Sequence, residues 1–165
     1  MLTDINHSLG DNSTTSRHYL PDDIFYDFYS HESIRGEGKF VEVDVPFDEI
    51  QLYYKGGSIV AQRSESANTT TELRKKNFSL IIAPGLDGAA SGSLYLDDGV
   101  SLSQDATTYI DFSYTKDGVF SMNGHFDYNA GVYIESIVVL GSGSDDKQVV
   151  IHEPIPLSDK YTLQT

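Results

Sequence analysis

Residues 91–99 of the chain have the sequence SGSLYLDDG. Leu94 and Leu96 alternate with polar or amphipathic neighbours, and this period of two predicts a strand with one buried face. Asp98 and Gly99 then predict a turn, because an aspartate side chain bonds nearby backbone and glycine accepts a positive φ. We expect this strand and its turn to anchor the fold around them.

A second apolar run occupies residues 78–83, shortly before this strand. The link between them, residues 84–88, is PGLDG and is rich in turn residues. Two apolar runs joined by such a link are typical of adjacent antiparallel strands. We therefore predict that these two strands pair directly with each other.

Short alternating runs recur along most of the chain. They cover residues 24–29, 40–45, 50–54, 59–61, 110–114, 119–122, 125–128, 132–140 and 149–151. Lys116-Asp117-Gly118 and Asn123-Gly124 are hairpin-type turns between such runs. Strands spaced by about 8–12 residues and separated by turns indicate antiparallel sandwiches. We predict an all-β fold of two small antiparallel β-sandwich domains.

Helix is predicted at one place only, within residues 67–76. Thr69 and Glu72 have the spacing of a capping box. The segment has a single apolar residue of any size, Leu73, and it is too short to hold a helix alone. We predict a turn or one helical turn there. Residues 1–18 are polar and are predicted to be a disordered or linker segment.

Composition limits the classes of function. The 165 residues carry a net charge of −14, with 25 acidic and 11 basic residues. Such an acidic surface repels phosphate backbones, which disfavours nucleic-acid binding. No run of about 18 apolar residues is present, so no membrane span is expected. With no cysteine, disulfides and thiolate metal sites are excluded.

The N-terminal residues lack the basic and apolar regions of a secretory signal. Asn-x-Ser/Thr triplets nevertheless occur four times. Asn6, Asn12 and Asn68 are possible glycosylation sites. Asn77 opens an apolar strand and is the poorest candidate of the four.

The usual constellations of catalysis and metal binding are not found. The five histidines are scattered without ligand spacing and predict ordinary surface or core positions, so no metal and no cofactor is expected. Asp97 and Asp98 could be considered as a glycosidase pair. Retaining enzymes need carboxyls about 5–5.5 Å apart that converge on one bond, whereas adjacent strand residues point to opposite faces. We predict a turn cap at Asp98 and an outward carboxylate at Asp97.

Aromatic side chains could form an exposed sugar-binding platform. The candidates are Phe25, Tyr26, Phe28, Tyr29, Tyr53 and Tyr54. The alternative, which we favour, is that these rings belong to the core or lie beneath another domain. An apolar face in excess of what one small sandwich buries would indicate the second case.

Four ordered segments carry a specific resemblance. They are residues 19–29 (YLPDDIFYDFY), 50–62 (IQLYYKGGSIVAQ), 71–74 (TELR) and 92–99 (GSLYLDDG). The chain resembles the C-terminal region of glycoside hydrolase family 31, which contains the α-glucosidases. Within it, the sequence of residues 67–99 is most similar to that of secreted fungal members. The residues of this resemblance that we expect to be structural are Tyr26, Asp27, Lys55, Gly56, Gly57, Asp97, Asp98 and Gly99.

The resemblance implies a proximal sandwich near residues 19–75 and a distal sandwich near residues 76–165. It implies that the catalytic (β/α)₈ barrel is absent from this chain and is its missing partner. The aspartates of catalysis belong to barrel motifs outside these residues, so no catalytic residue is carried over. The family commonly has Arg where this chain has Lys55, and Lys cannot make the planar bidentate contacts of Arg, which implies weaker docking on a barrel.

The resemblance therefore implies an accessory segment of an enzyme that removes glucose from the non-reducing ends of maltose- or starch-type oligosaccharides, with retention. The chain alone is expected to be inactive and to be a fragment of a secreted glycoprotein. The alternative left open is a free-standing β-sandwich that binds carbohydrate. A titration with maltose and starch would separate the two.

Overall fold

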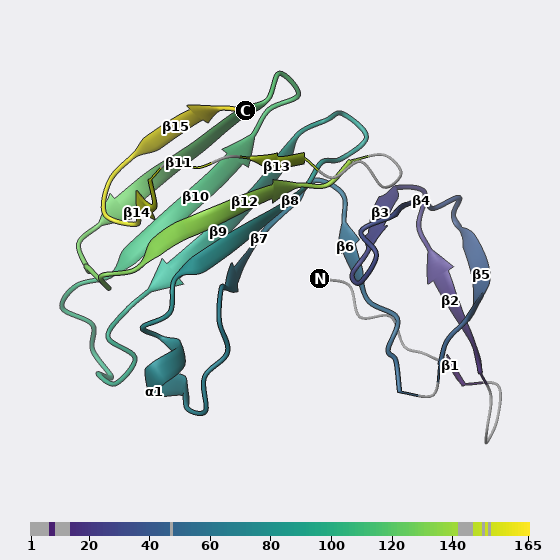
Figure 1. The fold of residues 1–165 in the computed structure, drawn as a ribbon, viewed down its shortest axis with the longest axis horizontal. Coiled ribbons are helices and arrows are strands. Elements are labelled where there is room, and N and C mark those ends of the chain that lie inside the picture. Colours follow the sequence, from purple (N-terminus) through teal and green to yellow (C-terminus); the bar gives the residue numbers. More distant parts are fainter. Residues whose placement is uncertain (1–6, 9–13, 47, 142–146, 150, 152) are drawn as a thin grey trace.

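The structure is a computed structural model, and it describes residues 7–8, 14–46, 48–141, 147–149, 151 and 153–165. It is almost entirely β, as predicted. Figure 1 shows two parts: a large sheet toward the C-terminus, and two small sheets packed beside it toward the N-terminus. No helix in the described ranges is both long and apolar enough to span a bilayer.

The N-terminal part contains two three-stranded sheets. The first has the order β1-β2-β5, and the second has the order β4-β3-β6. Their bounds are β1 (His7–Ser8), β2 (Thr15–Leu20), β3 (Ile24–Asp27), β4 (Ser33–Arg35), β5 (Lys39–Asp44) and β6 (Tyr53–Lys55). All pairs within these sheets are antiparallel. Strand β1 and the first residues of β2 lie within residues 1–18, which the sequence predicted to be a disordered or linker segment.

Strand β3 is buried on both sides, which explains why its sequence is nearly all aromatic or β-branched. Phe25 packs into one cluster with Leu20 and Tyr53. Tyr26, the next residue, points the other way into a cluster that includes Ala83 of the large sheet. Neighbouring residues of a strand face opposite sides, so β3 joins the small sheets to the large one.

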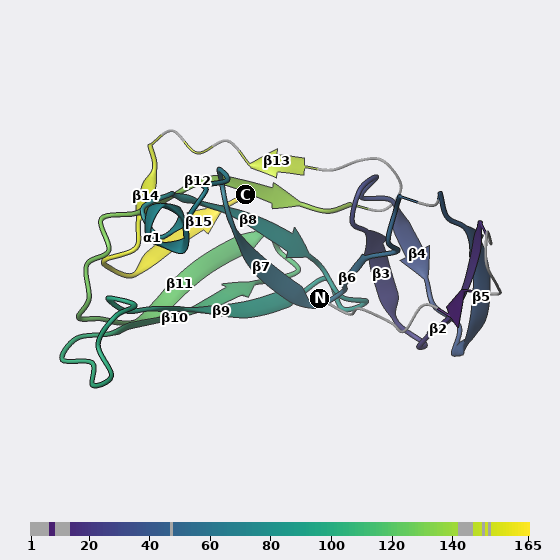
Figure 2. The ribbon, with the colours of Figure 1, turned by 90° about the horizontal axis from the view of Figure 1, so that it is seen from below.

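The large sheet has nine strands. Its order is β13-β12-β8-β7-β9-β10-β11-β15, with β14 paired to β12. The bounds are β7 (Ser58–Arg63), β8 (Phe78–Ala83), β9 (Ala90–Leu96), β10 (Thr108–Tyr114), β11 (Val119–Phe126), β12 (Tyr133–Val139), β13 (Lys147–Val149), β14 (Ile155–Pro156) and β15 (Tyr161–Gln164). In Figure 2 the layer of β9, β10 and β11 lies below the layer of β8 and β12.

These two layers enclose the main core. Its fully buried side chains include Leu80, Ile82, Ile110, Phe112, Phe120, Met122, Ile134 and Ile137. Strand β10 has the alternation that the sequence predicted, with Ile110, Phe112 and Tyr114 inside. Strand β12 pairs with β8 in parallel, an arrangement that hairpin signals do not indicate.

The predicted direct pairing of residues 78–83 with residues 91–99 is wrong. Strand β7 lies between β8 and β9: it pairs with β8 along its whole length and meets β9 at Ser58 and Ser91. Gly92 makes this approach possible, because a Cβ there would lie 2.2 Å from the carbonyl oxygen of Ile59. Residues 84–88 still form a turn, which is closed by the Gly85 amide donating to the Ala89 carbonyl at 2.8 Å.

The predicted hairpin at Asn123-Gly124 is also wrong, because β11 runs straight through both residues. Gly124 pairs with Ile110, and a Cβ at Gly124 would lie 2.0 Å from the carbonyl oxygen of Tyr109. This glycine therefore permits close approach between strands rather than a turn. The hairpin at Lys116-Asp117-Gly118 forms as predicted, between β10 and β11.

The short helix forms where the capping box predicted it. Helix α1 spans Thr70–Leu73, and the hydroxyl of Thr69 accepts the Glu72 amide at 3.2 Å. The proposed boundary between residues 75 and 76 remains a prediction. Strand β7 precedes that boundary in sequence and pairs with β8, which follows it.

Candidate functional site

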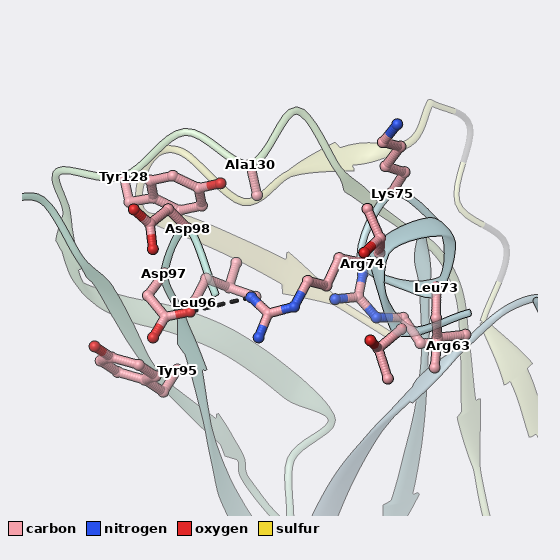
Figure 3. Close-up of a pocket in the computed structure, with 12 residues that line it drawn as sticks. Arg63, Leu73, Arg74, Lys75, Tyr95, Leu96, Asp97, Asp98, Tyr128 and Ala130 are labelled. Atoms are coloured by element: carbon pink, nitrogen blue, oxygen red, sulfur yellow. Dashed lines mark hydrogen bonds and ion pairs between the residues drawn. The ribbon is translucent and has the colours of Figure 1, made fainter. Parts of the chain in front are cut away.

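A hollow of about 560 Å³ lies between α1 and the end of β9 (Figure 3). It brings together two of the four segments quoted above, residues 71–74 and residues 92–99. The residues that line it are Arg63, Thr70, Thr71, Leu73, Arg74, Lys75, Tyr95, Leu96, Asp97, Asp98, Tyr128 and Ala130. Its lining is mixed, with cations on the helix side and carboxylates on the strand side.

Arg74 and Asp97 span the hollow. The guanidinium Nη1 of Arg74 donates to Oδ1 of Asp97 at 3.1 Å (Figure 3). The Arg74 side chain lies over Gly99, where a Cβ would be 1.7 Å from that nitrogen. Gly99 has φ +70°, a conformation that favours glycine, and the ion pair ties the C-terminal end of α1 to the end of β9.

Asp98 closes β9 with the predicted turn chemistry. Its Oδ1 accepts the backbone amides of Val100 at 2.9 Å and Ser101 at 3.0 Å, and the Gln104 amide at 3.1 Å. The Ser101 hydroxyl also donates to this carboxylate. The Ser101 hydroxyl, the two backbone amides and Gln104 hold the pKa of Asp98 well below its usual range.

This geometry does not suit Asp97 and Asp98 to acid–base catalysis. A glycosidase acid needs a raised pKa so that it carries a proton near neutral pH. Asp98 has the opposite shift, and Asp97 is paired with a guanidinium. Asp98 therefore caps the turn, as the sequence predicted, and Asp97 joins the end of β9 to Arg74.

Arg63 also lines the hollow. Its guanidinium carbon lies 3.9 Å from the centroid of the Phe78 ring, and it donates to the Lys76 carbonyl. Burial lowers the pKa of Arg63. Stacking on an aromatic face and a backbone hydrogen bond are typical of a structural arginine.

The segments around Tyr26 and Gly56 meet where the small sheets join the large one. The Tyr26 hydroxyl donates to the Pro84 carbonyl at 2.9 Å, and the Gly57 amide donates to Ala83 at 2.8 Å. The Gly56 amide donates to the Ile24 carbonyl at 2.8 Å, and a Cβ at Gly56 would lie 2.3 Å from the Ile24 side chain. Gly57 has φ +82°, so both glycines are needed at this junction.

Two further residues of the resemblance, Asp27 and Lys55, have local roles. The Asp27 carboxylate accepts the amides of Tyr29 at 2.9 Å and Ser30 at 2.8 Å, which shapes the turn after β3. Lys55 Nζ lies 3.5 Å from Oδ2 of Asp23. Its side chain is half-exposed, so the ion pair contributes little stability.

The six aromatic residues considered as a sugar-binding platform do not form one exposed surface. Phe25, Tyr26, Tyr53 and Tyr54 are buried. Phe28 stacks on Tyr54 with 5.2 Å between ring centroids. Tyr29, the sixth candidate, is 56% exposed. The favoured alternative, that these rings belong to the core, is therefore confirmed for the four that are buried.

Tyr53 is held by a buried polar cluster. Its hydroxyl lies 2.9 Å from Nε2 of His18 and donates to Gln51 at 2.8 Å. Burial, with a smaller contribution from the charge of Asp27, raises the pKa of Tyr53 to about 12. Burial also raises the pKa of Tyr54, whose hydroxyl accepts from Gln62 at 2.6 Å.

The three histidines whose side chains the structure describes lie on different strands and loops. His18 is buried against Tyr53, His31 lies beside Tyr54, and His125 lies beside Tyr109. The side chains of His7 and His152 lie outside the described residues. In the part of the chain that the structure describes, no three His, Cys, Asp or Glu side chains gather as a metal site would require.

Pairs of exposed aromatic side chains occur at two places that the sequence did not single out, and a single exposed ring, Tyr133, lies on β12. On the outer face of β2 and β5, Tyr19 is 42% exposed and Phe40 is 58% exposed, with their rings edge to face at 5.5 Å. Arg17 lies 4.8 Å over the Phe40 ring. On the outer face of the large sheet, Tyr95 and Tyr109 are exposed. In the sequence, each of these tyrosines alternates with apolar residues and so falls on the same strand face as polar residues. That alternation could have predicted that the tyrosines are exposed.

The glycosylation candidates stay predictions. Asn68 is exposed in the loop before α1, whereas Asn6 and Asn12 lie outside the described residues. The side-chain NH₂ of Asn77 donates to the Glu135 carboxylate, and its side-chain oxygen accepts the Tyr133 backbone amide. A side-chain amide held in this way is a poor glycan acceptor.

Comparison with known proteins places these features in one family. The family model described as "Glycosyl hydrolase family 31 C-terminal domain" matches residues 6–60. Probable alpha/beta-glucosidases of Aspergillus flavus and Aspergillus oryzae are each 53% identical over 148 residues, which cover 89% of this chain and 16% of theirs. A probable alpha/beta-glucosidase of Arthroderma benhamiae is 48% identical over 136 residues, covering 81% of this chain and 16% of its own. The chain thus spans about a sixth of the length of these curated relatives.

Solved structures show the same fold. The endoplasmic-reticulum glucosidase II heterodimeric complex matches 93% of this chain and 21% of its own, with a TM-score of 0.76 and 17% identity. The GH31 alpha-xylosidase of Xanthomonas citri matches 93% of this chain and 18% of its own, with a TM-score of 0.73 and 15% identity. In each, the matching region is one part of a larger enzyme.

Proposed function

The chain belongs to glycoside hydrolase family 31 as its C-terminal β-region, and from this premise we propose that it is the accessory part of an α-glucosidase. It supplies a folded surface for the catalytic barrel and leaves the chemistry to that barrel. The observation that carries the proposal is the identity of about one half with fungal alpha/beta-glucosidases over most of this chain.

Two exposed aromatic rings on neighbouring strands fit this role. Tyr19, Phe40 and Arg17 lie on one face of β2 and β5, opposite the face on which His18 and Leu20 are buried. Aromatic residues and arginine are the side chains enriched at protein interfaces. The same strands fall within the residues that the family model matches. We propose that the catalytic barrel covers this face.

The reaction of the whole enzyme is also a proposal. By family resemblance, it hydrolyses terminal α-glucosidic bonds with retention, through two carboxyls of the barrel about 5–5.5 Å apart. The chain alone is proposed to have no such activity, because neither Asp97 nor Asp98 suits an acid–base role. Secretion and a glycan at exposed Asn68 belong to the same proposal.

The test is association with a catalytic partner. The Aspergillus oryzae relative, cut before the region that matches this chain, is co-expressed with this chain, and the complex is sought by gel filtration. We expect a 1:1 complex that Tyr19→Ser with Phe40→Ser weakens by at least about tenfold. The control is Leu102→Ser, on an exposed loop of the large sheet. Absence of any complex, or equal weakening by the control, would refute the proposal.

A further inference from the structure

The outer face of β9, β10 and β11 carries side chains in strict cross-strand register. Tyr95 lies opposite Tyr109, which lies opposite His125. The next row along the strands is Ser93, Asp111 and Asn123, and the row beyond it is Ser91, Ser113 and Ser121. One aromatic row is therefore followed by rows of hydroxyl, amide and carboxylate groups.

The aromatic row is open to solvent. Tyr95 is 51% exposed and Tyr109 is 39% exposed. The rings of Tyr109 and His125 are nearly parallel, 15° apart in plane and 6.3 Å apart in centroid. Adjacent strands lie about 4.8 Å apart, so three side chains in a row span about 10 Å. That length suits a disaccharide unit of a longer chain.

The strands that carry this face are held in place by pairing and by the core. Ile110, Phe112 and Met122, on the opposite side of the same strands, are buried in the core. Seven residue pairs align β10 with β11, and seven align it with β9. Gly124 lets β11 approach the Tyr109 carbonyl closely. A surface held in this way loses little entropy on binding.

The charge and composition of the face select a neutral, hydroxyl-rich ligand. Although the chain has a net charge of −14, these three rows contain one carboxylate, Asp111, and no lysine or arginine. Phosphate backbones require cations. Cores of protein interfaces are depleted of serine and aspartate, and here four serines surround Asp111. Sugar rings, by contrast, lay their C–H faces on aromatic rings and exchange hydrogen bonds with hydroxyls, amides and carboxylates.

We propose that this face, made of Tyr95, Tyr109, His125, Ser93, Asp111 and Asn123 and called here the tyrosine row face, binds α-linked gluco-oligosaccharides as a site apart from the active site. The choice of α-linked glucose rests on the proposed function, whereas the choice of a neutral glycan rests on the face itself. The site would hold a polymeric substrate beside the enzyme.

The test uses this chain and two probes, soluble starch in a native gel and maltohexaose in an NMR titration. Starch is expected to retard the chain, and maltohexaose is expected to shift the ring signals of Tyr95, Tyr109 and His125. Tyr95→Ser with Tyr109→Ser is expected to weaken binding at least about tenfold. Tyr133→Ser is the matched control, because Tyr133 is 42% exposed on β12, in the other layer.

Thermal unfolding of each variant confirms that it is folded. Asp111→Asn, which keeps both tyrosines, gives a second variant that is expected to weaken maltohexaose binding. No retardation of the unaltered chain, equal loss in Tyr133→Ser, or equal binding of cellohexaose would overturn the proposal. These outcomes are separate from complex formation with a catalytic barrel, so either proposal can fail without the other.

Discussion

The Tyr26 hydroxyl and the Pro84 carbonyl, 58 residues apart in sequence, form a hydrogen bond of 2.9 Å across the junction of the two parts. Tyr26 is 3% exposed and packs with Tyr54, Ile81 and Leu140. The small sheets and the large sheet are therefore joined by a shared apolar cluster with a polar contact at its edge. In this account, that junction lets the chain act as one body against a partner.

Tyr26→Phe tests this junction. Removing the hydroxyl leaves the ring in the cluster and deletes one hydrogen bond, so we expect a loss of about 0.5–1.5 kcal/mol in the free energy of unfolding. Urea denaturation measures it. Tyr29→Phe, on an exposed ring, is expected to change stability by less than about 0.5 kcal/mol. Equal effects of the two changes would contradict the assigned role of the contact.

The Arg74–Asp97 ion pair should contribute modestly. Both side chains are partly exposed, 48% and 24%, so solvent screening limits the interaction to about 1 kcal/mol or less. A double-mutant cycle with Arg74→Ala and Asp97→Ala measures the coupling. We expect the coupling to shrink as salt is raised, because exposed charges are screened. A coupling that is insensitive to salt would show that the pair does not act through charge.

The substitution Asp98→Asn should reduce the stability that the chain loses as the pH falls. An unfolded aspartate has a pKa of about 3.9, and hydrogen bonds lower the pKa of Asp98 in the folded chain. The ionised carboxylate thus stabilises the fold above that pH, and this contribution is lost as the pH falls below it. The melting temperature of the variant should fall less than that of the unaltered chain between about pH 5 and pH 3.

Asp127→Asn is the control for this measurement, because it removes one exposed charge near the end of β11. It is expected to leave most of the acid dependence in place. If both variants flatten the profile equally, net charge rather than the Asp98 turn governs the effect.

Gly124→Ala should be strongly destabilising. Its Cβ would lie 2.0 Å from the Tyr109 carbonyl oxygen, a backbone atom that cannot rotate away. We expect a loss of about 2 kcal/mol or more in the free energy of unfolding. Gly131→Asn is the comparison, because nothing lies within 4 Å of that position and asparagine tolerates its φ of +64°. A stable Gly124→Ala variant would mean that β10 and β11 are not paired as described.

The sequence predicted most of this fold because its strands alternate clearly and its turns use distinctive residues. The alternation in β10, the capping box at Thr69 and the Asp98 turn all formed as predicted. Strand order could not be predicted in the same way. The position of β7 between β8 and β9 depends on contacts between residues far apart in sequence, which no local pattern encodes.

The candidate sites, like the fold, could be predicted where local patterns decide them and could not where distant contacts decide them. That Tyr26, Tyr54 and Phe25 are buried followed from their dense apolar context. The tyrosine row face did not, because Tyr95, Tyr109 and His125 come together only through the register of three strands. Asn123-Gly124 has the local chemistry of a turn, and only the close approach of Tyr109 shows why the glycine lies inside a strand.

The most direct test of the central claim is a chimera. The region of the Aspergillus oryzae relative that matches this chain is replaced by this chain, and hydrolysis of a chromogenic α-glucoside is measured beside the truncated relative and the isolated chain. The account predicts turnover by the chimera and none by the isolated chain or the truncated relative. Turnover by the isolated chain, or a chimera no more active than the truncated relative, would contradict it.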